Sequence, residues 1–135
     1  RDAGQQSAMV EIVFDHDSST LAETELASIR RLIEKVRGMP TMIEIHGHSS
    51  KEESSRDPQN GFDLSYQRAR SVSRILQENG IPARRIKIVA AGDNDPLKGH
   101  PIDARDDAPN RRVEIRVTDR MAVGQVRSET SLKGS

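Results

Sequence analysis

The motifs Ile45-His46-Gly47-His48-Ser49-Ser50 and Leu64-Ser65-Tyr66-Gln67-Arg68-Ala69 decide the fold of this chain. The first motif ends a predicted strand, and the second opens a predicted helix. Arg68 shares the apolar stripe of that helix with Val72 and Ile75, because positions three or four apart lie on one face. A guanidinium is costly to bury without an anionic partner. The pattern therefore predicts that Arg68 meets a carboxylate.

Apolar residues alternate with polar ones in four segments, the pattern of a half-buried strand. The inward positions are Val10, Ile12 and Phe14; Ile43 and Ile45; Ile86, Ile88 and Ala90; and Val113, Ile115 and Val117. A first helix is predicted to begin at a capping box of Thr20 and Glu23 and to end at Gly38. A second helix is predicted from about Leu64 to Asn79, after a polar loop over residues 51–61.

The order of these segments predicts an α/β (α+β) two-layer sandwich of the pattern βαβαβ-β. Its four-stranded mixed sheet would carry two main helices on one face, the simplest way to bury both apolar stripes. We expect a domain over residues 9–118, a flexible remnant over residues 1–8 and a disordered tail over residues 119–135. The chain starts with Arg1 rather than Met, so we interpret it as a fragment cut from a longer protein.

The composition excludes several classes of function. The 135 residues suffice for one domain, and 21 Lys+Arg balance 21 Asp+Glu, which argues against binding to nucleic acid or directly to a membrane. The absence of cysteine excludes disulfides and thiolate metal sites. Only Phe14, Phe62 and Tyr66 are aromatic, so stacking of bases or sugars is not expected.

Two interpretations of Arg68 follow from the pattern alone. In the first, a structural carboxylate such as Asp63 pairs with it. In the second, Arg68 and the free amides of the helix start together bind an external carboxylate, since a guanidinium suits a bidentate grip and the helix start adds positive potential.

An enzymatic or metal-binding role has weaker support. His46 and His48 would approach His16 if the first two strands were neighbours, but no third ligand is fixed by spacing. No G-x-S-x-G motif places a serine nucleophile. Residues 92–96 lack EF-hand spacing and predict a tight turn. We therefore expect no enzyme activity, no cofactor and no resident metal.

Five motifs in order resemble the OmpA-like peptidoglycan-binding domain of outer-membrane proteins, the Pal lipoprotein and flagellar stator B subunits. They are Phe14 to Leu21, the strand end IHGHSS, the helix motif LSYQRA with Val72, Gly92 to Pro96, and Asn110-Arg111-Arg112-Val113-Glu114. The segment from Gly61 to Ser65 is most similar to the stator type.

The resemblance implies a ligand, the peptide stem of peptidoglycan, held by the ammonium and carboxylate of its diaminopimelate. The family arginine corresponds to Arg68, and Ser50 stands where the family has an aspartate. Gly61 stands at the family asparagine, with Asn60 adjacent, and a loop acid (Glu52, Glu53, Asp57 or Asp63) would compensate for the missing aspartate. The expected ligand-binding residues are Arg68, Ser50, Asp15, Leu64, Asp63, Asn60 and Arg112.

The resemblance thus implies a non-catalytic, periplasmic domain that attaches a larger protein to the cell wall. That larger protein would be anchored in the inner or outer membrane, and the flagellar stator is the type that the resemblance favours. Its partners would be peptidoglycan and a second copy of the chain. The alternative is an OmpA-like fold that has lost wall binding and serves as an envelope protein interaction or dimerisation module.

Overall fold

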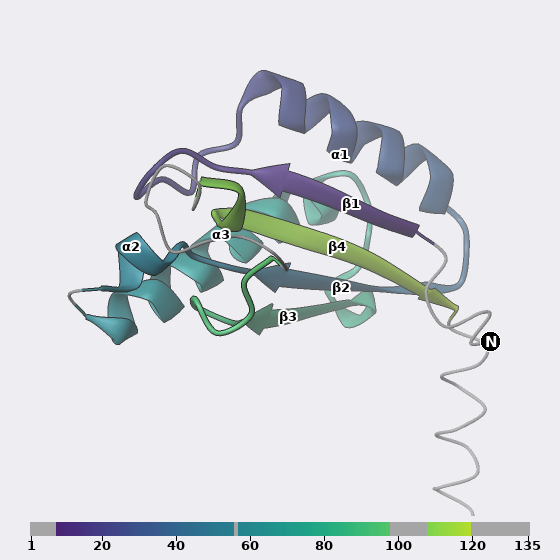
Figure 1. The fold of residues 1–135 in the computed structure, drawn as a ribbon. Helices are drawn as coiled ribbons and strands as arrows, with labels where there is room; N and C mark the ends of the chain where they lie inside the picture. Colours follow the sequence, from purple (N-terminus) through teal and green to yellow (C-terminus); the bar gives the residue numbers. More distant parts are fainter. Residues whose placement is uncertain (1–7, 56, 98–107, 120–135) are drawn as a thin grey trace, which may run out of the picture.

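A four-stranded mixed sheet forms the framework of the computed structural model, which describes residues 8–55, 57–97 and 108–119 (Figure 1). The strands are β1 (Ala8–Val13), β2 (Thr41–Gly47), β3 (Ile86–Ala90) and β4 (Arg112–Asp119), in the order β1-β4-β2-β3. β4 is antiparallel to both β1 and β2, whereas β2 and β3 are parallel. The predicted fold class is confirmed.

In the described part of the chain, three α-helices and two 3₁₀ turns connect the strands. They are α1 (Glu23–Val36), α2 (Lys51–Ser54), α3 (Pro58–Glu78), η1 (Ala83–Arg85) and η3 (Ala108–Asn110). In Figure 1, α1 lies over β1, α3 lies behind the sheet and α2 lies beside the end of β2. No helix in the described part of the chain is long and apolar enough to cross a membrane.

The core lies between one face of the sheet and both long helices. Cross-strand partners put Ile12 opposite Val113 and Ile45 opposite Ile115, so these side chains point to the same face. The buried cluster joins strand residues with helix residues Ile29, Leu32, Ile33, Val36, Ala69, Val72 and Leu76. The predicted apolar stripes are therefore the ones that pack together.

The predicted start of the first helix is wrong. The N-cap is Ala22, without a side-chain cap, and Glu23 is the first helical residue rather than part of a capping box with Thr20. The preceding segment is held by tertiary contacts, because the Ser19 carbonyl accepts a hydrogen bond from Ser71 Oγ at 2.8 Å. These contacts override the local capping signal.

The predicted start of the second helix and the predicted polar loop are also wrong. The α3 helix begins at Pro58, capped by the Asp57 carboxylate, which accepts a hydrogen bond from the Gln59 amide at 3.0 Å. Proline suits the first helical position because its missing N–H would be unpaired there. Arg68 consequently lies about three turns inside the helix, so the amides of the helix start cannot share a ligand with it in the predicted way.

Gly47 brings the two motifs together. A Cβ atom at this position would lie 1.9 Å from the carbonyl oxygen of Ser65, so only glycine permits the observed approach of α3 to β2. The predicted end segments lie outside the described residues, except that β1 already includes Ala8 and β4 extends to Asp119.

Candidate functional site

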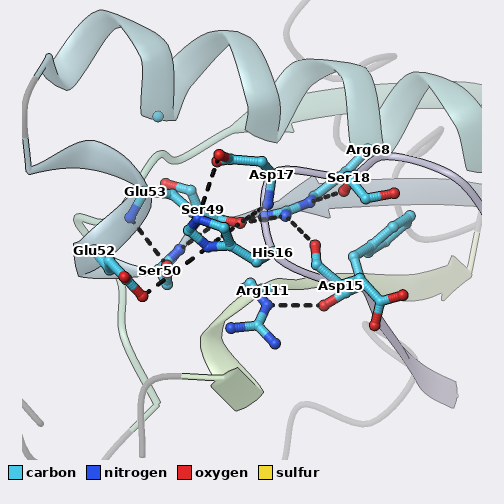
Figure 2. Close-up of polar contacts among 12 residues, drawn as sticks. Asp15, His16, Asp17, Ser18, Ser49, Ser50, Glu52, Glu53, Arg68 and Arg111 are labelled. Atoms are coloured by element: carbon cyan, nitrogen blue, oxygen red, sulfur yellow. Dashed lines mark hydrogen bonds and ion pairs between the residues drawn. The ribbon is translucent and has the colours of Figure 1, made fainter. Parts of the chain in front are cut away.

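Four parts of the chain converge at the end of β2: the turn after β1, the residues that follow β2, the single-turn helix α2 and the middle of α3 (Figure 2). Gly47 ends β2, and the motif residues His48 to Ser50 lead directly into α2. The two motifs that decide the fold therefore also build this site.

Arg68 lies at the centre of the site and has no exposed side-chain surface. Its Nε–H donates to the Ser18 carbonyl at 2.8 Å, and its Nη1 and Nη2 donate to the carbonyls of His48 at 3.0 Å and Asp15 at 3.1 Å. The same two nitrogens donate to the Glu53 carboxylate at 2.8 and 2.7 Å. A guanidinium has five N–H groups. Each of them therefore has an acceptor within this chain.

Glu53 is the carboxylate that Arg68 holds, and its side chain is equally buried. Its oxygens also accept hydrogen bonds from the amides of Ser50 at 2.9 Å and Asp17 at 2.7 Å. Burial raises the pKa of this carboxyl, but the hydrogen bonds from Arg68 and the two amides outweigh it and hold the pKa below its ordinary value. Glu53 is thus ionised at neutral pH, and its carboxylate accepts four hydrogen bonds.

The α2 turn positions Glu53. Ser50 is the N-cap: its Oγ accepts from the Glu53 amide at 3.1 Å while the Glu53 carboxylate accepts from the Ser50 amide, which is a capping box. Asn60 Nδ2 donates to the Glu53 carbonyl at 3.0 Å and ties α2 to α3. Gly61 allows this approach, because a Cβ atom there would lie 1.9 Å from Ser54 Oγ. The sequence S-x-x-E at 50–53 was the signal that could have revealed α2.

A polar pocket of about 540 Å³ opens beside this ion pair. Among the described residues, its lining includes His16, Asp17, Glu52, Glu53, Ser55, Asp57 and Asn60. His16, half exposed, lies 3.3 Å from an Asp17 oxygen and 3.9 and 4.0 Å from oxygens of Glu53 and Glu52. Four carboxylates line one pocket, so its electrostatic potential favours a cationic group.

The structure brings most of the predicted site residues to this region. Ser50 is fully buried beneath the pocket as the cap of α2, and Asp15 takes part through its carbonyl. Asn60 lines the pocket itself. Asp63 and Leu64 line an adjoining cavity of about 200 Å³. The exposed Asp63 accepts a hydrogen bond from Gln59 at 3.1 Å, so it is not the carboxylate that pairs with Arg68.

Arg112 is held elsewhere, at the start of β4. It donates to the Glu114 carboxylate at 2.8 Å, to Asn110 Oδ1 at 3.3 Å and to the Asp95 carbonyl at 3.0 Å. These contacts fasten the turn after β3 to the sheet. Contact of Arg112 with a ligand stays a prediction.

The proposed grouping of three histidines is wrong. β4 lies between β1 and β2, so the strand that precedes His16 and the strand that carries His46 are not neighbours. His46 pairs instead with Glu44 at 2.8 Å. Among the described residues, the group with metal-binding geometry is His16, Asp17 and Glu53. The Glu53 oxygens in that group already accept four hydrogen bonds, which makes them poor ligands.

His48 has an unusual environment. Its imidazole is 1% exposed, and neither ring nitrogen has a hydrogen-bond partner. Burial, and next the positive charge of Arg112, lower its pKa to about 4, although Glu114 lies 4.0 Å away. His48 is therefore neutral at pH 7. Sequence reasoning missed this buried state.

Comparison with known proteins identifies the family to which this domain belongs. The model of the OmpA family matches residues 13–111. The chain belongs to the OmpA family. No curated protein sequence matches it. Solved OmpA-like structures, however, share the fold.

Three solved structures illustrate the similarity of this OmpA-family domain to known folds. The peptidoglycan-associated lipoprotein of Burkholderia pseudomallei has a TM-score of 0.71 at 24% identity, covering 80% of this chain and 89% of that one. The cell wall anchor of the T6SS from Pseudomonas aeruginosa has a TM-score of 0.70 at 26% identity, and the match covers 88% of this chain and 85% of the anchor. The C-terminal domain of Helicobacter pylori MotB has a TM-score of 0.70 at 19% identity, and the match covers 93% of this chain and 98% of the MotB domain. The OmpA family is non-catalytic, which confirms the expectation that the chain is not an enzyme.

Proposed function

We propose that this OmpA-family domain anchors a larger envelope protein to peptidoglycan in the periplasm. Family membership supports the proposal, as do the similar structures of a peptidoglycan-associated lipoprotein and a cell wall anchor. One observation carries it. A polar pocket of about 540 Å³ opens where the two ligand motifs of the family meet, beside the Glu53–Arg68 pair.

The ligand that we propose is the peptide stem, recognised through its diaminopimelate. The ammonium of that residue would enter the pocket among the carboxylates of Asp17, Glu52 and Asp57. The rest of the stem would extend over Asn60 toward the adjoining cavity, which Asp63 and Leu64 line. Asp15, Ser50 and Arg68 would not contact the ligand directly but would hold the residues of the pocket wall in place. Attachment of the domain to a flagellar stator stays a prediction, because the similar structures come from several kinds of machine.

The test is co-sedimentation of the domain with purified sacculi. Glu52→Lys places a cation where the ligand ammonium would lie, and we expect retention to fall by roughly tenfold or more, the value of one charge-assisted contact. Glu34→Lys is the matched control, since Glu34 is an exposed acid on α1 whose ion pair with Arg37 spans 3.8 Å. Equal retention of both variants, or no retention of the unmodified domain, would contradict the proposal.

The alternative function, an interaction module without wall binding, is favoured by one observation. All five N–H groups of Arg68 are used within the chain. Sedimentation equilibrium over a range of concentrations would reveal self-association. A stable dimer that does not bind sacculi would favour this alternative over the wall anchor.

A further inference from the structure

The buried Glu53 carboxylate accepts hydrogen bonds from both Nη atoms of Arg68, the bidentate contact that a guanidinium would otherwise offer to an external carboxylate. We propose that Glu53 is a specificity-determining residue: it stands in for the carboxylate of the ligand, so the pocket recognises the ammonium end of the stem. On this proposal the domain binds a stem whose diaminopimelate carboxylate is amidated as tightly as one whose carboxylate is free. The inference rests on the proposed wall-binding function and specifies its ligand.

The first support is the complete use of the Arg68 guanidinium. Both Nη atoms donate to Glu53 at 2.7 and 2.8 Å, and the remaining N–H groups donate to backbone carbonyls. An external carboxylate could reach Arg68 only by displacing Glu53. The displaced carboxylate would lose two charge-assisted hydrogen bonds, and the exchange of one acid for another offers no gain.

The second support is the way in which Glu53 is held. The capping box with Ser50 and the amide of Asp17 fix its carboxylate independently of Arg68. The Asn60 side chain fastens its backbone carbonyl to α3. Displacement of Glu53 would therefore disrupt α2 as well as the ion pair. These contacts make Glu53 a fixed part of the pocket wall.

The third support is the charge of the pocket. The described residues that line it include no lysine or arginine, whereas Asp17, Glu52, Glu53 and Asp57 carry carboxylates. A ligand carboxylate entering this pocket meets repulsion, and an ammonium meets attraction. A neutral amide in place of the carboxylate meets no such penalty.

Relative to the family motif, the acid has moved by one helical turn. Ser50 stands at the position of the family aspartate, and the carboxylate is supplied three residues later by Glu53. The double variant S50D/E53A returns the acid to the family position without changing the net charge. It also frees two N–H groups of Arg68.

The test uses isothermal titration calorimetry with three synthetic stem peptides. One ends in diaminopimelate, one in diaminopimelate amidated at its free-end carboxylate, and one in lysine, which lacks that carboxylate. We expect the unmodified domain to bind all three within about threefold. S50D/E53A should prefer the free-acid peptide by roughly tenfold or more, the effect of one regained charge-assisted hydrogen bond. Glu34→Ala, which removes an exposed glutamate, is the control and should bind like the unmodified domain.

Three outcomes are distinguishable. Preference of the unmodified domain for the free acid by tenfold would overturn the role of Glu53 and leave wall binding intact. Absence of binding to every peptide and to sacculi would overturn both proposals. If thermal melting shows that S50D/E53A is unfolded, the same titrations are made with Glu53→Gln, because this variant keeps the side-chain shape and removes the competing charge. Glu53→Gln should also gain preference for the free acid, and failure to gain it would contradict the inference.

Discussion

Two buried arginine–glutamate pairs in this domain show how differently the same chemistry can be used. Arg68 and Glu53 are 15 residues apart in sequence, both fully buried, and they join the turn after β1, the end of β2, α2 and α3. Arg112 and Glu114 are two residues apart on β4, and Glu114 is 8% exposed and shared with Arg116. The first pair holds separate elements together, whereas the second extends along one strand. We therefore expect the first pair to matter more for stability.

Glu53→Ala should be the most damaging change, because it leaves Arg68 buried without its counter-charge. Breaking a buried pair costs about 3–5 kcal/mol in the free energy of unfolding. Urea denaturation followed by circular dichroism measures the loss, with Glu34→Ala as the exposed control. A loss below about 1 kcal/mol would show that solvent reaches Arg68 and that the pair does not join these elements.

His48 next to the second pair should make stability depend on pH. Its pKa is about 4 in the folded domain and 6.5 ordinarily, so the unfolded chain takes up the proton first as the pH falls. The free energy of unfolding therefore has its full value above about pH 6.5. It falls by about 3 kcal/mol as the pH drops from about 6.5 to 4.

His48→Phe should remove this dependence, as measured by urea midpoints across the same range. The groups that face His48 are Arg112, Glu114, Asp95 and His46. An unchanged pH profile in the variant would assign the dependence to one of these groups instead.

Glu114→Gln should cost less than Glu53→Ala, about 1–3 kcal/mol. The amide keeps one acceptor for Arg112 or Arg116, and the slight exposure of Glu114 lets water solvate the remaining guanidinium. Urea denaturation of the two variants side by side tests the ranking. A larger loss for Glu114→Gln would reverse the comparison of the two pairs.

Ser50→Ala should have the smallest effect of the four, about 1 kcal/mol. It removes the N-cap acceptor of α2 while leaving the Glu53–Arg68 contacts in place. Hydrogen exchange at the Glu53 amide should accelerate, because that amide loses its Ser50 partner. Unchanged exchange there would mean that the capping box does not hold α2.

The strands and the apolar faces of both helices were predictable from local patterns. Alternation at Ile43 and Ile45 and helical spacing at Val72 and Leu76 both identify residues that the structure buries in one core. The start of α3 at Asp57-Pro58 was readable as well, from a cap residue followed by proline. It was missed because the polar composition of residues 51–61 resembles a loop.

The partner of Arg68 shows where prediction from sequence ended. The apolar stripe required an anion, but Asp63 and an external ligand were the candidates, and the partner is Glu53. A four-residue helix has no periodicity to detect, so the direction of Glu53 depends on packing of α2 against α3. The histidine hypothesis failed for a related reason, since the strand order β1-β4-β2 is set by pairing between distant segments.

By itself, the sequence determined that this chain forms an OmpA-like two-layer domain in which Arg68 is buried and must meet a carboxylate. This was possible because burial follows from the spacing of apolar residues along each element. Only the tertiary structure decided which carboxylate Arg68 meets, and that four acids surround the adjoining pocket. Those features depend on distances between residues that are far apart in the chain, and local patterns carry no information about such distances.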